Sequence, residues 1–512
     1  MTAFATSFTS TKWWWNSAKS IVTLLLALVA VLPAQSQVLQ TGRYELPLLP
    51  QERHIETITA GKNGVFLYRT YFGQKDDVLQ LIKIDTAFSE EWSGYLHIEK
   101  GYIIMGRQSF DGKLYLLLRY HTYAKNDLIL LAIDERNGSY VRYHVPCFIP
   151  LLPSQFNITN NGALIGGYYN RVPVVLFFTF DTRTTKVLPG LFNEAGELAQ
   201  VKTYNDGTFD VLISSKNFSR QRTMWIKNYD ADGNLLRNLP LDPGDKHFIF
   251  GRAVRGVENT QIVAGVFGTV NAEYSKGLFI TALNPDGESV TRLYHFSELE
   301  NFFAYMKPRR EERIKSRIER KLARGKHARF SYRFLVHELI PYQGNYILLG
   351  EAFVPQYRYP RAANYGSTPA RIFDGYLYTH AVVMCFDKTG NLLWDNSFEI
   401  NDIKTFTLDQ FVKIESFDDK IALIYMYDNT IRTKVIQSDK VVEGKTIDPI
   451  QIFSDTEVVK RDLSDHGRLE YWYGDSLLAC GIQEIAGKPG VGASRRTVFY
   501  INKIRFADHS ED

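Results

Sequence analysis

The amino-acid sequence predicts an all-β fold, a β-propeller with eight four-stranded blades, or seven as the alternative count. Strand-like runs recur along the whole chain after its first 36 residues, and Asp-Gly or Asn-Gly turns separate them. The runs group by four into units of roughly 40–50 residues, which is the repeat length of propeller blades. The chain is also rich in residues that suit a pleated, half-buried surface, with 33 Phe and 30 Tyr in 512 residues.

The repeat predicts one propeller domain over residues 37–512, with two insertions at 301–328 and 353–378. A β-sandwich would not need so many repeats, and a barrel would not show the grouping by four. The predicted units are 52–98, 99–146, 150–192, 195–241, 245–299, 329–400, 404–452 and 456–506.

The two ends of the repeat predict how the ring closes. The last unit supplies three clear strands, near Arg468–Tyr473, Ser476–Gln483 and Thr497–Phe506. The segment Gly42–Leu49 is strand-like and has no local partner. Because an unpaired strand edge is a liability, we expect Gly42–Leu49 to pair with the last unit and complete its sheet.

The N-terminal segment 1–36 has the parts of a secretory signal peptide. It contains no Asp or Glu, carries Lys12 and Lys19, and continues into an apolar run, Ile21–Leu32, followed by small residues. The run of about 12 residues is short of the roughly 20 that span a bilayer. We therefore expect export to the periplasm, outer cell envelope or extracellular space, with a mature chain that begins near Gln37.

The alternative for this segment is an uncleaved anchor, since Trp13–Trp15 could lie at a membrane interface. No stretch after residue 36 is long and apolar enough for a transmembrane helix. The three cysteines, Cys147, Cys385 and Cys480, are too few for a disulfide framework and match no zinc spacing, so free thiols are expected.

The first insertion predicts a strongly basic helix. Between Lys307 and Arg329 there are eleven Lys or Arg and three Glu, a net charge of +8 in a chain whose formal net charge is +4. Pro308 suits the first turn of a helix and Gly325 suits its end. An apolar stripe of Ile314, Ile318 and Leu322 recurs at every fourth residue.

Two interpretations of this helix remain open. It can be a solvated helix that the apolar stripe holds to the propeller, or a docking element for an acidic protein or an anionic envelope component such as a lipid head group or phosphorylated glycan. Nucleic acid would fit the charge equally well, but export argues against it. The candidate binding residues are Arg313, Arg317, Arg320 and Arg324.

The second insertion, 353–378, is expected to be a loop rich in aromatic and Arg side chains. Tyr and Arg are favoured at protein-binding hot spots, and stacking of sugars would use the same side chains. The alternative is a loop that covers the edge of its own blade. The candidate binding residues are Tyr357, Arg358, Tyr359, Arg361 and Tyr365.

One segment resembles the start of a calcium loop, because Asn228, Asp230 and Asp232 place oxygen ligands at alternate positions before a glycine. The twelfth position, where such a loop has a bidentate Glu, is Leu239, so a hairpin turn is the favoured interpretation. The sequence contains no HExxH and no G-x-S-x-G motif, and it names no catalytic residue. No cofactor is predicted, with calcium as a weak alternative.

Two segments, 385–394 (CFDKTGNLLW) and 228–236 (NYDADGNLL), each have an apolar strand, an Asp, a glycine turn and further apolar residues. They resemble the strand–turn–strand of quinoprotein-type propeller repeats. The resemblance implies the propeller fold. It also implies a calcium and quinone-cofactor constellation in the enzymes of that type, which no residues of this sequence match.

Three functions are compatible with these patterns. The favoured one is an exported envelope binding or assembly protein that uses a propeller surface for protein–protein interaction, without catalysis. The alternatives are a hydrolytic or carbohydrate-active propeller with acids at its central channel, and a quinoprotein-like oxidoreductase. A central channel lined by three or more carboxylates would favour the hydrolytic or carbohydrate-active propeller. A calcium ion beside a planar cavity would favour the quinoprotein-like oxidoreductase.

Overall fold

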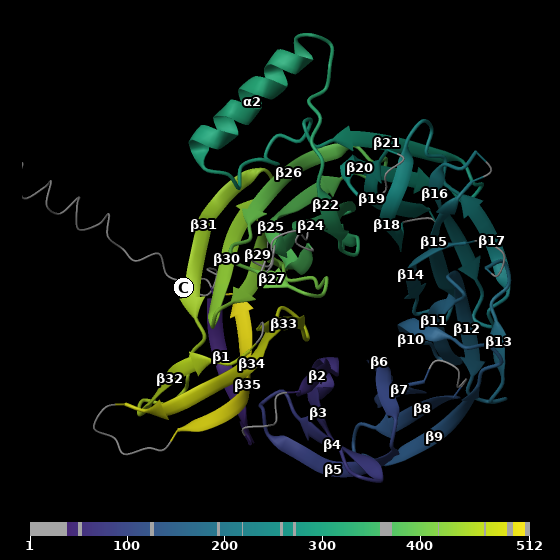
Figure 1. Cartoon of the computed structure of the whole chain (residues 1–512), viewed down its shortest axis with the longest axis vertical. Coiled ribbons are helices and arrows are strands. Elements are labelled where there is room, and N and C mark those ends of the chain that lie inside the picture. The colour runs from purple at the N-terminus through teal and green to yellow at the C-terminus, as the bar shows by residue number, and fades with distance from the viewer. Residues whose placement is uncertain are drawn as a thin grey trace, which may run out of the picture.

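The computed structural model describes residues 38–49, 54–122, 127–191, 195–217, 219–256, 260–269, 273–358, 371–417, 419–464, 467–488 and 495–506. They form eight antiparallel sheets arranged as the blades of a ring, and β2, β6, β10, β14 and β18, the first strands of blades 1 to 5, lie nearest its centre (Figure 1). The predicted all-β propeller with eight blades and one helix is therefore confirmed, and each predicted unit corresponds to one blade. The predicted signal peptide, 1–36, lies outside the described residues.

The first four blades follow one another along the chain. Blade 1 contains β2 (Glu56–Thr59), β3 (Val65–Tyr71), β4 (Asp76–Ile84) and β5 (Glu90–Glu99), with a short 3-10 helix, η1 (Gly61–Asn63), after β2. Blade 2 contains β6 (Tyr102–Phe110), β7 (Lys113–Tyr120), β8 (Asp127–Asp134) and β9 (Tyr140–Pro146). Blade 3 contains β10 (Leu152–Ile158), β11 (Gly162–Tyr169), β12 (Val172–Thr179) and β13 (Thr185–Val187). Blade 4 contains β14 (Gly196–Thr203), β15 (Phe209–Lys216), β16 (Arg222–Tyr229) and β17 (Leu235–Pro240).

The last four blades contain the irregular elements. Blade 5 contains β18 (His247–Arg255), β19 (Gln261–Gly268), β20 (Ser275–Leu283) and β21 (Ser289–His295). Blade 6 contains β22 (Arg333–Val336), β24 (Asn345–Arg358), β25 (Ile372–Phe386) and β26 (Leu392–Glu399), with the short β23 (Ile340–Tyr342) and β27 (Lys404–Thr405). Blade 7 contains β28 (Lys413–Phe417), β29 (Lys420–Tyr427), β30 (Thr430–Gln437) and β31 (Lys440–Pro449). Blade 8 contains β32 (Glu457–Asp462), β33 (Arg468–Tyr471), β34 (Leu477–Gly487), β35 (Arg496–Phe506) and β1 (Val38–Leu48).

The ring closes as the sequence predicts. Strand β1 pairs antiparallel with β35, from Val38 opposite Phe506 to Leu48 opposite Thr497, and forms the outer strand of blade 8. The first strand of the described chain thereby completes the sheet of the last blade, and no edge of β35 is left open.

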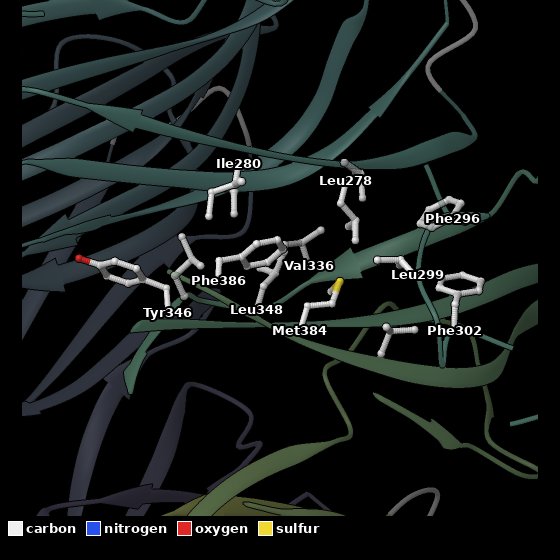
Figure 2. Packing of buried hydrophobic residues seen from close by; sticks show 14 of the residues in the cluster. Leu278, Ile280, Phe296, Leu299, Phe302, Val336, Tyr346, Leu348, Met384 and Phe386 are labelled. Atoms are coloured by element: carbon white, nitrogen blue, oxygen red, sulfur yellow. The ribbon is translucent and has the colours of Figure 1, made fainter. Parts of the chain in front are cut away.

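The hydrophobic core lies between neighbouring blades. The two middle strands of a blade are buried on both faces because each blade packs against two others, so β7 and β12 each hold six consecutive buried residues. Between blades 5 and 6 the core also takes in side chains from the connecting segment, among them Phe296, Leu299 and Phe302 (Figure 2). Cys385 and Cys480 are buried and Cys147 is half-buried, and all three are free thiols.

The connection between blades 5 and 6 carries the predicted basic helix, α2 (Pro308–Leu322), which lies outside the ring (Figure 1). Pro308 is at its first turn, and Gly325 follows its end with a φ of 65°. Among the described residues, no helix has the length and apolar content needed to cross a bilayer.

The second insertion differs from the predicted loop. Strands β24 and β25 continue past the blade as a two-stranded hairpin, paired from Phe353 opposite Tyr378 to Arg358 opposite Ile372. The two runs are rich in aromatic and β-branched residues, such as Phe353, Val354, Tyr357, Ile372 and Phe373, which suit a pleated ribbon and favour their pairing. We call this element the blade 6 hairpin (residues 353–358 and 371–378).

Strand direction places these features on one face of the ring. Because direction alternates within a blade, the hairpin between its second and third strands lies on the same face as the connection to the next blade. The blade 6 hairpin, the connection that carries α2, and the connections into blades 1, 7 and 8 therefore share this face, which we call the connection face.

Candidate binding surfaces on the connection face

A cavity of about 830 Å³ lies where blades 7, 8, 1 and 2 meet at the centre of the ring. Its walls come mainly from the inner strands β2, β6, β28 and β33, from the segment 407–411, and from Leu463, Ser464 and Gly467. The charged side chains that line it are Glu56, Arg107, Asp409, Lys413, Arg468 and Glu470.

Glu56 is the centre of an ion-pair cluster that joins three blades. Its Oε2 lies 2.9 Å from Nη2 of Arg107 in blade 2, and Arg468 in blade 8 donates to both of its carboxylate oxygens. Arg107 also donates to the hydroxyl of Tyr68 at 2.9 Å. Burial raises the pKa of Glu56, but the hydrogen bond from Arg468 and the charge of Arg107 outweigh it and leave that pKa below its ordinary value.

Glu470 occupies a different environment in the same cavity. Burial raises its pKa above the ordinary value, and its hydrogen bond with Thr57 only partly opposes the rise. Burial likewise lowers the pKa of Lys413, whose ammonium lies 5.6 Å from the centre of the Tyr471 ring. The lining thus has the three carboxylates expected of a hydrolytic propeller, but three cations accompany them and Glu56 is held in ion pairs with two of these cations.

A buried carboxylate anchors the segment that carries Lys413. Glu351 is fully buried on β24, and its Oε1 accepts the backbone N–H of Val412 at 2.8 Å and lies 2.7 Å from Nε2 of His337. This contact ties the start of β28, and with it Lys413, to blade 6.

Glu415, also on β28, gives a pH-dependent prediction. Burial and the charge of Asp475 raise its pKa to about 7. Between the unfolded-state pKa of about 4.3 and pH 7 the unfolded chain releases this proton while the folded protein retains it, so stability falls as pH rises through that window. We expect Glu415→Gln to stabilise the protein relative to the wild type more at pH 8 than at pH 5. The gain in the free energy of unfolding should be larger at pH 8 by about 1–3 kcal/mol.

The measurement is urea unfolding of both proteins at the two pH values. The same substitution at Glu90, which is exposed on β5, is the control. A difference between wild type and Glu415→Gln that does not change with pH would contradict the prediction.

The blade 6 hairpin presents a continuous series of aromatic rings. Tyr357 and Phe373 have ring centres 5.8 Å apart, and Phe373 and Tyr376 are 4.9 Å apart. Phe353 continues the series towards the cavity, 5.4 Å from Tyr376 and 6.1 Å from Tyr378. Phe406, on the neighbouring connection, is 72% exposed. Phe353 and Tyr378 belong to the buried core, whereas Tyr357 and Phe406 are exposed and Phe373 and Tyr376 are half-buried, so the outer rings of the series form an apolar surface next to the cavity.

Two of the five predicted binding residues of this insertion lie on the hairpin. The guanidinium of Arg371 stacks over the ring of Tyr357 at 3.6 Å, and Arg358 lies 3.9 Å from the carboxylate of Asp374. Tyr359, Arg361 and Tyr365 lie outside the described residues.

Helix α2 is held to blade 6 by part of its apolar stripe. Ile318 is buried, and Ile314 and Met306 pack against the same core, whereas Leu322 is 46% exposed. Below the helix, the backbone N–H groups of Glu300 and Asn301 donate to the carboxylate of Asp395 at 2.9 and 2.8 Å. The base of the insertion is therefore fixed while its basic face points to solvent.

The four arginines predicted to bind lie along this exposed helix and its end. Arg320 donates to its own helix backbone at Ser316, and Arg317 lies 5.9 Å from the centre of the Phe330 ring. A shallow hollow of about 460 Å³ follows one side of α2. Its lining residues are Arg309, Glu312, Arg313, Ser316 and Arg320.

The three predicted metal ligands lie in and beside a hairpin turn. Oδ1 of Asp230 accepts the backbone N–H groups of Asp232 and Asn234 at 3.0 and 2.7 Å, and Gly233 has a φ of 76°. Asn228 donates its amide to Asp210 at 2.6 Å. Within the part of the chain that the structure describes, no group of three or more His, Cys, Asp or Glu is arranged to hold a metal ion.

The same turn explains the repeat-like segments. In blade 6 the carboxylate of Asp387 accepts the N–H groups of Thr389 and Asn391, both at 2.8 Å, and Gly390 has a φ of 82°. Both segments thus form the turn before the outer strand of a blade, with Asp as the side chain that stabilises it.

The chain is similar to known proteins in fold only. No model of a known family matches it, and no curated protein matches it. It is a β-propeller. Solved structures with this arrangement include the polysaccharide lyase Uly1, with a TM-score of 0.39 and 10% identity over 89% of this chain and 100% of that chain. The propeller domain of the Trilobed protease from Pyrococcus furiosus matches with a TM-score of 0.37 and 8% identity over 80% and 97%.

A periplasmic gluconolactonase of Pseudomonas aeruginosa, PpgL, also matches this propeller, with a TM-score of 0.36 and 10% identity over 78% of this chain and 100% of that chain. At such identities the likeness concerns the arrangement of strands alone. It gives no support to the quinoprotein type in particular, and the function has to be argued from this chain's own surfaces.

Proposed function

We propose that this is an exported binding or assembly protein that docks an acidic segment of a partner protein on α2. The observation that carries the proposal is the lack of internal partners for the charge of this helix. Of the eleven Lys and Arg between residues 307 and 329, only Lys315 is in an ion pair among the described residues, with Glu311 at 2.9 Å.

The energetics of the helix favour such a partner. Like charges one turn apart on a helix repel by a few tenths of a kcal/mol per pair, and three Glu cannot compensate eleven cations. The rest of the mature chain is net acidic, so the excess of positive charge lies in this insertion. An acidic partner would relieve the repulsion, and at physiological salt its attraction would act over about 8–10 Å.

The packing of the apolar stripe favours a protein over a membrane surface as the partner. A helix that lies in a bilayer interface buries its apolar face in the lipid. In α2, Ile314 and Ile318 already pack on the core between blades 5 and 6, which leaves mainly charged side chains exposed. A protein partner needs only this charged face.

We expect the variant Arg313→Gln, Arg317→Gln, Arg320→Gln and Arg324→Gln to lose most recovery of envelope proteins at low salt, because it removes four exposed cations from one helix. The measurement is affinity capture of a synthetic poly-glutamate peptide, followed by capture from envelope extract at two salt concentrations. For the wild type, binding should weaken as salt rises.

The matched control removes four exposed cations from other blades. It is Lys113→Gln, Arg237→Gln, Lys440→Gln and Lys460→Gln. If both variants bind the peptide equally, or if only vesicles with anionic lipid bind the wild type, the proposed protein partner is wrong.

A further inference from the structure

We propose that the cavity at the centre of the connection face is a binding site for a neutral oligosaccharide. This site is separate from α2 and goes beyond the proposed docking function. The inference rests on the size of the cavity, the balance of its charges and the aromatic surface that leads into it.

The cavity has the dimensions of a ligand site. Its volume of about 830 Å³ lies within the roughly 300–1,000 Å³ of small-ligand pockets. Four blades contribute to its walls, so several different sheets fix the positions of its side chains. The segment 407–411 forms one wall and is itself held by the backbone contact of Val412 with Glu351.

The polar groups of the lining are held rigidly and are only partly covered. Arg107 and Arg468 share the carboxylate of Glu56, yet their side chains remain 38% and 50% exposed, against 27% for Glu56. Guanidinium groups held by a carboxylate present the remaining N–H donors in fixed directions, and the carboxylates present acceptors beside them. Each sugar hydroxyl both donates and accepts, so such alternating groups suit it.

The charge of the lining favours a neutral ligand. Arg107, Lys413 and Arg468 are opposed by Glu56, Asp409 and Glu470, and the fully buried Glu351 lies near Lys413. Glu351 does not line the cavity, and the lining itself holds three cations and three carboxylates, so a charged ligand would gain no net attraction from it. The hydroxyl groups of a neutral sugar can accept hydrogen bonds from the cations and donate hydrogen bonds to the carboxylates.

The aromatic side chains supply the apolar part of the site. Phe411 lines the cavity, and its ring packs edge-on against the ring of Tyr378, with the two ring centres 5.0 Å apart. The exposed Phe406 lies 6.2 Å from Phe373 of the blade 6 hairpin. The C–H face of a sugar ring packs on flat aromatic surfaces of this kind, and a chain of several sugars could extend from the cavity along the hairpin.

The test is calorimetric titration of the mature protein with neutral tri- to pentasaccharides of glucose, mannose, galactose and xylose, beside oligogalacturonates and neutral pentapeptides. We expect at least one neutral saccharide to bind saturably. Arg107→Gln should weaken that binding at least tenfold, since it removes donors from the cavity wall and disturbs Glu56. Phe406→Ser should weaken it without affecting the ion-pair cluster.

The matched control is Arg142→Gln. Arg142 also joins blades 2 and 1, through an ion pair with Glu99 at 2.8 Å, but on the outer strands β9 and β5. It should leave saccharide binding unchanged. The proposal fails if none of the neutral saccharides binds, if oligogalacturonates or peptides alone bind, or if Arg107→Gln and Phe406→Ser both bind as the wild type does.

Discussion

Replacing Arg43 with methionine is expected to lower the free energy of unfolding by about 3–5 kcal/mol, because it leaves buried polar partners of a charged group unpaired. The Arg43 side chain on β1 is 3% exposed. It donates to the side chains of Glu45 at 2.6 Å, Gln483 at 2.8 Å and Asn502 at 3.0 Å, and to the backbone oxygen of Gln451 at 3.1 Å. One guanidinium thus joins the strand that closes the ring to β34, β35 and the connection from blade 7.

The measurement is urea unfolding followed by tryptophan fluorescence. The control is Arg505→Gln on β35, where the ion pair with Asp475 lies at 3.0 Å with both side chains about half exposed. An exposed pair contributes about 0–1 kcal/mol, so this variant should unfold close to the wild type. Equal losses in the two variants would show that the buried cluster around Arg43 does not hold the ring closed.

The closure itself could be predicted from the sequence because it follows from local patterns. Strand-like runs and Gly turns mark the blades, and a lone strand at 42–49 beside a three-stranded last unit leaves one sensible pairing. The structure has that pairing, with β1 on β35. The residues of the Arg43 cluster could not be predicted, because Arg43, Gln451 and Asn502 are far apart in sequence and each is an ordinary polar residue of a strand or connection.

The cavity could not be predicted from the sequence for the same reason. Glu56, Arg107, Lys413 and Arg468 each come from a short inner strand of a different blade, and none belongs to a motif. Only the ring geometry brings them together. By contrast, the charge of α2 is contiguous in sequence, so the helix and the buried position of Ile318 could be predicted directly.

The blade 6 hairpin differs from the predicted loop because the prediction assumed blade strands of ordinary length. Four-stranded blades of ordinary length leave residues 353–378 over, and this excess predicts a loop. Instead, residues 353–358 and 372–378 lengthen β24 and β25 to 14 and 15 residues. The available signal is the aromatic and β-branched residues at both ends of the segment, Phe353, Val354 and Tyr357 near its start and Ile372 and Phe373 near its end.

A second large effect is expected for Asp210→Ala, with a loss of about 3–5 kcal/mol in the free energy of unfolding. Asp210 on β15 is 3% exposed and joins blades 4 and 5. Its carboxylate accepts from Tyr204 at 2.7 Å, Arg255 at 2.9 Å and Gln261 at 2.8 Å, as well as from the amide of Asn228. Alanine would leave the Arg255 charge and three other donors without this acceptor.

The control for Asp210 removes a carboxylate near the same arginine. Asp206 lies 3.6 Å from Arg255, but its side chain is 61% exposed. Asp206→Ala should therefore cost no more than about 1 kcal/mol, since water replaces its contacts. The measurement is urea unfolding of both variants. If Asp210→Ala lowers the free energy of unfolding as little as Asp206→Ala does, the contact between blades 4 and 5 depends on apolar packing alone.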